Sequence, residues 1–270
     1  MNNLSFRVRL SYTVRAIISM VVMVSLVLLL GGLALIVGVV HPSRRLMDFC
    51  TRVWARSVLF CAGVRLTIKG WEQAADSRPA FFIGNHQSDL DILIIMFALR
   101  GQVRFMAKDS LFRIPLFGWV IRRYRFVPID RGNVRRTLQT LKQMIAAVHR
   151  NPISMTAFPE GTRSRDGRLL PFRRGTMKIV QQAGLPVVPF AIDGSIDVHR
   201  PGRMLRAAPG PVTLTFTAPI PADRVVAMTQ DELQERVVNA VAGALGQPSP
   251  AAQEEVSTEP SHPVGVGVVS

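Results

Sequence analysis

His86 and Asp91 are the two residues whose types and spacing are best suited to chemistry. They lie in a stretch that begins at Phe81, where a short apolar run ends abruptly in polar side chains. A carboxylate that accepts one imidazole N–H fixes the tautomer of the ring and leaves the other nitrogen free to act as a general base. On a continuous helix, side chains five residues apart point about 140° away from each other, so this pair requires a turn of the chain between its members.

A strand-to-helix turn supplies that geometry. Residues 80–84 have the apolar character and length of a buried strand, and residues 91–99 are nearly all apolar with the length of a helix. Ser88 is a good N-cap for this helix, and we expect Asp89 to be a capping acid at the positive end of the helix dipole. His86 then lies just outside the helix, and the turn at Ser88 can bring it back to Asp91.

Other interpretations of this stretch are open at this point. A His and an Asp at this spacing also occur together by chance in many proteins. Asp89 and Asp91 are also suited to capping the helix together, or to holding a divalent ion on a nucleotide sugar, as a metal-dependent glycosyltransferase requires.

A second polar turn follows the expected strand at residues 153–158. It contains Glu160, Gly161, Thr162 and Arg163. Gly161 allows the backbone to approach a ligand closely, and Arg163 offers a planar fork of donors suited to a phosphate. Ligands of open α/β sheets gather beyond the carboxyl ends of the strands, which favours a binding role. The alternative is that Glu160 and Arg163 simply pair with each other in a surface turn.

The net charge indicates a polyanionic partner. Thirty-three basic residues against 18 acidic ones give a formal charge of +15, which suits nucleic acid, an anionic membrane face or a phosphorylated substrate. Lys108 follows one expected strand and Arg131 ends another, so both are candidates to add positive charge to the same edge of the sheet. No motif of interleaved basic and aromatic residues indicates nucleic acid. A non-enzymatic basic membrane protein is the remaining alternative of a different class.

The N-terminal region is expected to lie in a membrane. Residues 16–40 are 25 consecutive residues without a charge, more than the roughly 20 that cross a bilayer. The sequence at residues 39–42 does not resemble the cleavage site of a signal peptide. Arginines flank the segment on both sides, so a single membrane helix and a re-entrant hairpin both stay open.

The organisation along the chain follows from composition and periodicity. We expect a membrane segment at residues 1–42, one catalytic domain at residues 43–246 and a disordered tail at residues 247–270. The domain begins with an amphipathic helix at residues 43–62, which either lies near the lipid surface or packs on the domain as an ordinary surface helix. Strand signals then alternate with helix signals, which predicts an α/β fold with a mixed, mostly parallel sheet flanked by helices. The expected strands are residues 65–69, 81–84, 103–107, 125–129, 153–158, 187–192 and 212–217; the expected helices are 91–99, 137–149, 176–183 and 231–245.

Four motifs in order carry a resemblance to a known family. They are Asn85-His86-x-x-x-x-Asp91, then Lys108 with Ile114-Pro115-x-x-Gly118 and Asp130-Arg131, then Phe158-Pro159-Glu160-Gly161-Thr162-Arg163-Ser164, then Val187-Val188-Pro189-Phe190. Over roughly residues 45–220 the chain resembles the glycerolipid acyltransferase family, and within it the bacterial 1-acylglycerol-3-phosphate acyltransferases. Phe190 departs from the pattern, because a smaller aliphatic residue is commoner there.

The resemblance implies roles for the residues of both turns. His86 is expected to be the general base that takes the proton of the acceptor hydroxyl, with Asp91 orienting the ring. The glycerol-phosphate part of lysophosphatidic acid is expected to be bound by Glu160, Gly161, Thr162 and Arg163, aided by Lys108 and Arg131. Direct transfer requires no protein nucleophile, and the sequence has no Gly-x-Ser-x-Gly elbow.

The resemblance also implies partners and a location. Acyl-CoA or acyl carrier protein is expected to supply the acyl group, with no metal and no bound cofactor. The expected location is the inner (cell) membrane of a bacterium, in contact with phospholipid, with the catalytic domain on the cytoplasmic face. Another lysolipid, such as lyso-ornithine lipid, is an alternative acceptor, although the arginines favour a phosphate headgroup.

Overall fold

The described residues form an α/β domain around a seven-stranded sheet. The computed structural model describes residues 10–22, 24–25, 29, 44–115, 117–123, 126–129, 154–202 and 208–250. The strand order is β1-β7-β6-β2-β5-β3-β4. The strands are β1 Val64–Lys69, β2 Phe81–Gly84, β3 Val103–Lys108, β4 Val127–Ile129, β5 Ser154–Ala157, β6 Val187–Asp193 and β7 Gly210–Phe216. Among these strands, only β6 and β7 pair antiparallel, which confirms the predicted mixed and mostly parallel sheet.

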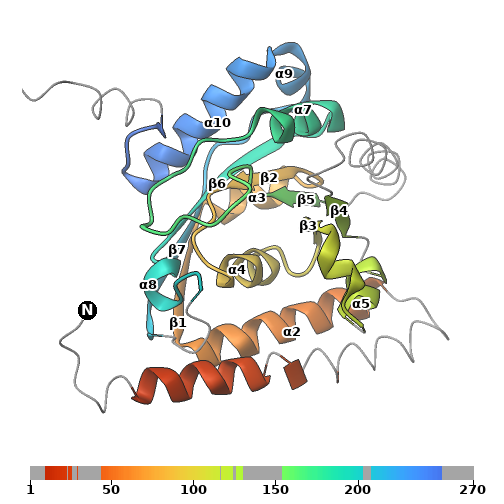
Figure 1. Cartoon of the computed structure of the whole chain (residues 1–270). Helices are drawn as coiled ribbons and strands as arrows, with labels where there is room; N and C mark the ends of the chain where they lie inside the picture. The colour runs from red at the N-terminus through yellow and green to blue at the C-terminus, as the bar shows by residue number, and fades with distance from the viewer. Residues whose placement is uncertain are drawn as a thin grey trace, which may run out of the picture.

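Helices cover both faces of the sheet. The helical elements are α2 Arg44–Ala62, α3 Trp71–Asp76, α4 Leu90–Ala98, η1 Asp109–Arg113, α5 Phe117–Arg123, α7 Arg174–Ala183, α8 Ser195–Val198, α9 Ala222–Ala227 and α10 Gln230–Leu245. Figure 1 shows α2 and α4 below the sheet and α7, α9 and α10 above it. The architecture is therefore three-layered, with the sheet buried between two helical layers.

The alternation of side chains along the central strands divides the core in two. In β2, Phe82 packs into the cluster that includes Leu93 and Ile94 of α4. The neighbouring Phe81 packs into the cluster on the other side, with Met177 of α7 and Val237 of α10. Successive side chains of a strand point to opposite faces, so a central strand covered on both faces is apolar at every position. All four residues of β2 are accordingly buried.

The N-terminal helix lies against the layer that contains α2. Residues 10–22 are helical and run beside α2 (Figure 1). Within the described residues, no helix has both the length and the apolar character needed to cross a membrane. Residues 23, 26–28 and 30–40 of the expected membrane segment lie outside the described part of the chain. The expected helix at residues 137–149 lies outside it as well, as do residues 251–270 of the tail.

The folded contacts extend to at least Gln247, the first residue of the expected tail. Its side-chain Oε1 accepts the N–H of Leu169 at 3.0 Å, and its Nε2 donates to the carbonyl of Gly167 at 3.0 Å. The helix α10 ends just before it, at Gly246 in a left-handed conformation with φ of 64°.

Candidate active site

His86 and Asp91 meet in the turn between β2 and α4. The Nδ1 atom of His86 lies 2.8 Å from Oδ2 of Asp91, which confirms that the turn folds the two side chains back together. The same Oδ2 accepts the backbone N–H groups of Gln87 at 2.6 Å and Ser88 at 2.8 Å. Asp91 is completely buried, whereas 15% of the His86 side chain is exposed. The carboxylate can only accept, so it holds the hydrogen on Nδ1 and leaves Nε2 of the ring free as a base.

The predicted caps of α4 are wrong in detail. The N-cap residue is Asp89, one residue later than expected, and its side chain makes no capping hydrogen bond. Instead, Ser88 Oγ accepts the N–H of Leu90 at 3.3 Å and donates to the carbonyl of His199 at 2.7 Å. The Asp89 carboxylate forms an ion pair with Arg163. A guanidinium offers charge as well as donors, so it attracts the exposed carboxylate more strongly than a neutral N–H does.

Backbone hydrogen bonds join this turn to the turn that follows β5. The N–H of Ser164 donates to the carbonyl of His86 at 2.8 Å. The N–H of His86 donates to Oε2 of Glu160 at 3.3 Å, and the side chain of Gln87 donates to the carbonyl of Gly167 at 3.0 Å. Strands β2 and β5 are parallel neighbours, so their carboxyl ends meet at the same edge of the sheet. The two polar clusters that lie 74 residues apart in sequence therefore form one site.

Glu160 supports the backbone of both turns. It is 3% exposed, and besides the His86 N–H its carboxyl group accepts the N–H of Leu170 at 3.4 Å. Burial raises the pKa of Glu160 to about 8, more than the two backbone hydrogen bonds lower it, and the nearby charge of Asp91 raises it further. A contact between Glu160 and the acceptor stays a prediction, because its observed contacts are with the chain itself.

The other residues of the second turn lie closer to the surface. Thr162 is exposed, and 34% of the Arg163 side chain is accessible. Gly161 has φ of 70°, a left-handed conformation that favours glycine. A Cβ there would lie 2.5 Å from Nε of Arg173, which donates to the carbonyl of Glu160 at 3.2 Å. The close approach at Gly161 is therefore made by Arg173.

Lys108 and Arg131 are the two remaining residues of the predicted site. Lys108 is the last residue of β3, which extends one residue beyond the expected strand, and its side chain lies outside the described part of the structure. Arg131 also lies outside the described residues. Their predicted contribution to a phosphate site stays a prediction.

Phe158 is a component of the site that sequence reasoning missed. Its ring stacks on the His86 imidazole with centroids 4.1 Å apart and an interplanar angle of 14°. Behind it, Phe190 packs edge-on at 6.0 Å and Phe105 lies at 6.4 Å. The sequence shows that Phe158 lies at the end of an expected strand. It does not show that β5 pairs with β2, and this pairing is what brings Phe158 beside the turn that carries His86.

Asn85 fixes the start of the turn to β6. Its Nδ2 donates to the carbonyl of Ile192 at 2.8 Å, and its Oδ1 accepts the N–H of the same residue at 2.8 Å. The preceding Gly84 is required by close packing, because a Cβ there would lie 2.2 Å from the carbonyl oxygen of Phe190. The motif before His86 therefore anchors the turn to the sheet.

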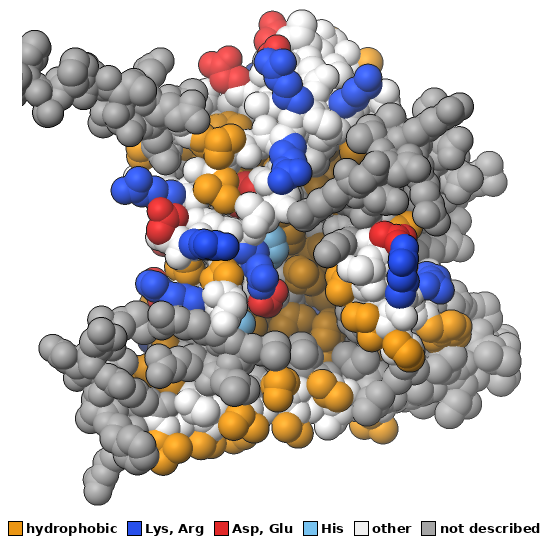
Figure 2. Space-filling model, in the orientation of Figure 1, with side chains coloured by type: hydrophobic (Ala, Val, Ile, Leu, Met, Phe, Trp, Pro, Cys, Tyr) orange, Lys and Arg blue, Asp and Glu red, His pale blue; other side chains and the backbone are white. Residues whose placement is uncertain are grey.

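The surroundings of the site combine apolar and basic groups. Figure 2 shows a hollow with hydrophobic side chains at its floor and histidine and Lys or Arg side chains at its edge. Asp89 and Asp91 face different partners, so they do not form the carboxylate pair of the metal-dependent alternative. Among the described residues, no group of three or more His, Cys, Asp or Glu side chains is placed to hold a metal ion.

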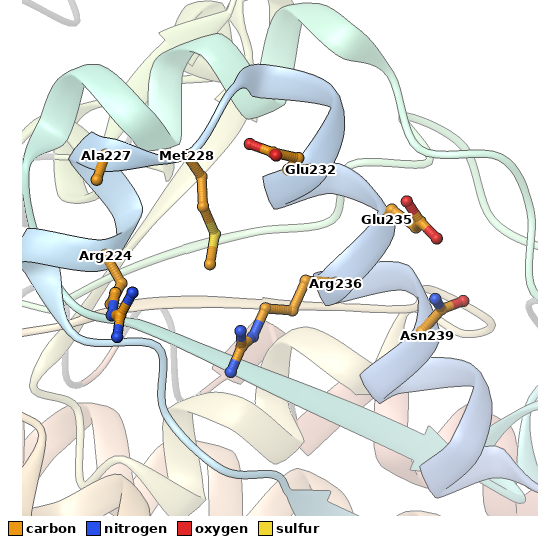
Figure 3. A pocket seen from close by; sticks show the side chains of 7 residues that line it. All are labelled: Arg224, Ala227, Met228, Glu232, Glu235, Arg236 and Asn239. Carbon is orange, nitrogen blue, oxygen red and sulfur yellow. The ribbon is translucent and has the colours of Figure 1, made fainter.

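A separate hollow lies between α9 and α10. It is lined by Arg224, Ala227, Met228, Glu232, Glu235, Arg236 and Asn239. Figure 3 shows Arg224, Met228 and Arg236 directed to the same side, whereas Glu235 and Asn239 point away from them. None of the residues around His86 lines this hollow, so it is distinct from the candidate active site.

Comparison with known proteins identifies the family. The model of the family described as Acyltransferase matches residues 65–193, a range that includes both turns. Residues 65–193 of this chain therefore form an acyltransferase family domain. The chain is 35% identical over 171 residues to a 1-acyl-sn-glycerol-3-phosphate acyltransferase from Cocos nucifera, covering 63% of this chain and 54% of the relative. It is 33% identical to the protein of the same name from Limnanthes douglasii, covering 62% of this chain and 58% of the relative.

A solved structure of an acyltransferase is similar over most of its length. The crystal structure of the 1-acyl-sn-glycerophosphate (LPA) acyltransferase PlsC from Thermotoga maritima is 25% identical, with a TM-score of 0.72. The match covers 94% of this chain and 98% of that chain. By contrast, the chain spans little more than half the length of the two plant relatives.

Proposed function

We propose that this chain, through its acyltransferase family domain, transfers a fatty acyl group from an acyl thioester to the free hydroxyl of a 1-acylglycerol-3-phosphate, giving phosphatidic acid. The observation that carries the proposal is that His86, hydrogen-bonded to Asp91, and Arg163 lie in two turns joined by the hydrogen bonds that the backbone of His86 makes to Ser164 and Glu160. A base and a fixed positive charge in adjoining turns suit an alcohol that carries a phosphate. The names of the relatives support the same acceptor.

The proposed chemistry uses the imidazole twice. Asp91 holds Nδ1, so Nε2 takes the proton of the acceptor hydroxyl while that oxygen attacks the carbonyl carbon of the thioester. The tetrahedral intermediate collapses, the C–S bond breaks, and the leaving thiolate receives the proton from the imidazolium. The products are an ester and a free thiol. A thioester is already an activated acyl donor, so the transfer needs no covalent intermediate on the protein.

We propose that the acceptor phosphate binds at the turn after β5. Arg163 offers a planar guanidinium that is partly accessible, and the exposed Thr162 adds a hydroxyl donor. Lys108 and Arg131 are proposed to add positive charge. Glu160 is proposed to act indirectly, by holding the N–H of His86.

We propose that the chain associates with a phospholipid membrane through its N-terminal helices. Five large apolar residues at helical spacing in residues 10–22 are 41% to 54% exposed: Leu10, Val14, Ile17, Ile18 and Val21. Two further apolar side chains, Phe49 and Phe60 of α2, are 63% and 81% exposed. Figure 2 shows hydrophobic side chains along the edge where these helices lie. Such a face is costly in water and suits a lipid interface.

The donor and the location complete the proposal. Acyl-CoA or acyl carrier protein supplies the thioester, and residues 16–40 enter the bilayer as a helix or hairpin. The proposed location is the inner membrane of a bacterium, with the catalytic domain facing the cytoplasm.

Acyl transfer by the purified full chain in phospholipid vesicles tests the proposed activity. Radiolabelled oleoyl-CoA and oleoyl-acyl carrier protein are each supplied with a panel of acceptors: 1-oleoylglycerol-3-phosphate, monooleoylglycerol, lysophosphatidylcholine and lyso-ornithine lipid. We expect the highest kcat/KM for 1-oleoylglycerol-3-phosphate. Preference for a phosphate-free acceptor would overturn the choice of substrate, and transfer to none of them would overturn the enzymatic proposal.

Flotation with vesicles tests the membrane surface separately. We expect the wild-type chain to float with vesicles containing phosphatidylglycerol, and the variant F49S/F60S to float less. These two side chains are mostly exposed, so the substitution has little effect on packing. Equal flotation of both proteins would exclude α2 from the lipid contact.

A further inference from the structure

Asp89 and Arg163 form an ion pair that bridges the two turns of the site. Asp89 lies between His86 and Asp91 in sequence, and Arg163 ends the Glu160–Arg163 cluster. The family resemblance gives no role to Asp89, and its side chain makes no capping hydrogen bond on α4. Its observed partner is the guanidinium to which the proposed function assigns the acceptor phosphate.

We propose that Asp89 is an internal anion that occupies Arg163 until the phosphate of the acceptor displaces it, and that it thereby sets the affinity for phosphate-bearing acceptors. The inference rests on the proposed function, since it concerns the same site. It makes Asp89 a specificity-determining residue that acts on acceptor binding and has no part in the proton transfer of His86.

The exposure of the pair makes exchange feasible. The Asp89 side chain is 59% exposed and that of Arg163 is 34% exposed, so solvent screens their attraction. A phosphate monoester carries between one and two negative charges at neutral pH, and its oxygens can accept two guanidinium N–H groups in parallel. The incoming phosphate is therefore a stronger partner for Arg163 than the single carboxylate that it replaces.

The backbone of Arg163 is held independently of Asp89, which decides the direction of the effect. The adjacent Ser164 donates its N–H to the carbonyl of His86 at 2.8 Å, and Glu160 accepts the N–H of His86 at 3.3 Å. These bonds fix the turn after β5 against the turn after β2. Loss of the Asp89 charge therefore frees the guanidinium without displacing the turn that carries it. The Asp89 carboxylate and the acceptor phosphate therefore compete for the guanidinium of Arg163. Asp89 is not required to orient Arg163.

Kinetics of D89N test the competition. We expect KM for 1-oleoylglycerol-3-phosphate to fall by about twofold to fivefold, the range typical of one exposed ion pair. The change in kcat should be smaller than the change in KM. Higher ionic strength should reduce the difference between the variant and the wild type, because exposed charges are screened by salt. For monooleoylglycerol, which has no phosphate, KM should not change.

Three further variants make the result specific. D231N removes another exposed carboxylate, paired with Arg174 at 3.4 Å outside the site, and controls for net charge. D89E keeps the charge and should keep the wild-type KM. In an R163Q background, D89N should no longer change KM, because the two residues act through one interaction.

Each other outcome has a definite meaning. A higher KM in D89N would overturn competition and show that Asp89 orients Arg163. An unchanged KM, or an equal fall in D231N, would overturn a specific role for the pair. Calorimetric titration of glycerol 3-phosphate onto wild type and D89N gives a readout without turnover, where tighter binding to D89N is expected. Absence of transfer in every protein, with this difference in binding retained, would overturn the proposed function and leave the inference standing.

Discussion

Asp91 Oδ2 is bound at once by the imidazole of His86 at 2.8 Å and by the backbone N–H groups of Gln87 and Ser88. One buried oxygen therefore orients the ring and also closes the turn that carries it. The proposed role of His86 is chemical only, whereas Asp91 in addition holds the backbone of the turn.

H86A and D91A should separate these two roles. We expect H86A to lower kcat by about 10² to 10⁴, the usual contribution of a general base. D91A should lower kcat to a similar extent and should also lower the free energy of unfolding by about 2–4 kcal/mol, because it leaves two buried backbone donors unpaired. Acyl transfer and urea unfolding measure the two effects. H86A with half of the wild-type kcat would contradict the assignment of the base.

Much of the fold is readable from local patterns. The stretch around β2 and α4 was predicted within one residue at each end, because an apolar strand, a polar turn and an apolar helix differ sharply in sequence. The order of strands in the sheet was not predicted. That order places β1 beside β7, and their separation of more than a hundred residues leaves no local signal.

The misjudged details of the site share one cause, which is contact between distant segments. A carboxylate at residue 89 satisfies the rules for a helix cap, and nothing nearby in sequence indicates that Arg163 will attract it. The burial of Glu160 to 3% also comes from tertiary packing and has no local signal, while its contact with the acceptor stays a prediction of the family resemblance. The stack of Phe158 on His86 likewise depends on the pairing of β2 with β5.

N85A should destabilise the protein more than a comparable change in the same turn. Asn85 is 1% exposed and bonds both the N–H and the carbonyl of Ile192, so its loss leaves two buried backbone groups without a partner. We expect the free energy of unfolding to fall by roughly 2–5 kcal/mol.

Q87A is the matched control for N85A. Gln87 is also buried, but the carbonyl of Gly167 that it contacts keeps a second donor in Gln247, so we expect a loss of only about 1 kcal/mol. Urea unfolding of both variants measures the difference. Equal losses would show that the two bonds to Ile192 do not anchor the turn.

F158L should affect turnover through the orientation of the imidazole. Leucine keeps the site apolar but removes the ring face that lies 4.1 Å from the centroid of His86. Such a stack is worth about 0.5–1.5 kcal/mol, so we expect kcat to fall by about threefold to tenfold with little change in the acceptor KM. F216L is the control. Phe216 packs on Phe190 at 6.4 Å, and the rings of Phe190 and Phe158 separate it from His86. If F216L lowered kcat as much as F158L, general loosening of the cluster would explain both.

Glu160 should make the stability of the protein depend on pH. Burial raises its pKa from the ordinary 4.5 to about 8, so between these values the folded state binds a proton that the unfolded state has released. Stability therefore falls as pH rises through this window and levels off above it, with a total change of up to about 5 kcal/mol. E160Q cannot ionise, but its amide nitrogen cannot accept the second of the two backbone N–H groups that Glu160 accepts. We therefore expect it to be less stable than the wild type near pH 5, and we expect the difference in its favour to grow by about 2–5 kcal/mol between pH 5 and pH 8.5.

Urea unfolding from pH 5 to pH 8.5 measures this difference between E160Q and the wild type. E235Q is the control, since it makes the same substitution at an exposed position of α10. If the free energies of unfolding of E160Q and the wild type changed in parallel with pH, the pKa of Glu160 would be the same in the folded and unfolded states. In that case the backbone N–H groups of His86 and Leu170 would stabilise the Glu160 carboxylate enough to offset its burial. The N–H of His86 would then be bonded to a charged carboxylate at neutral pH.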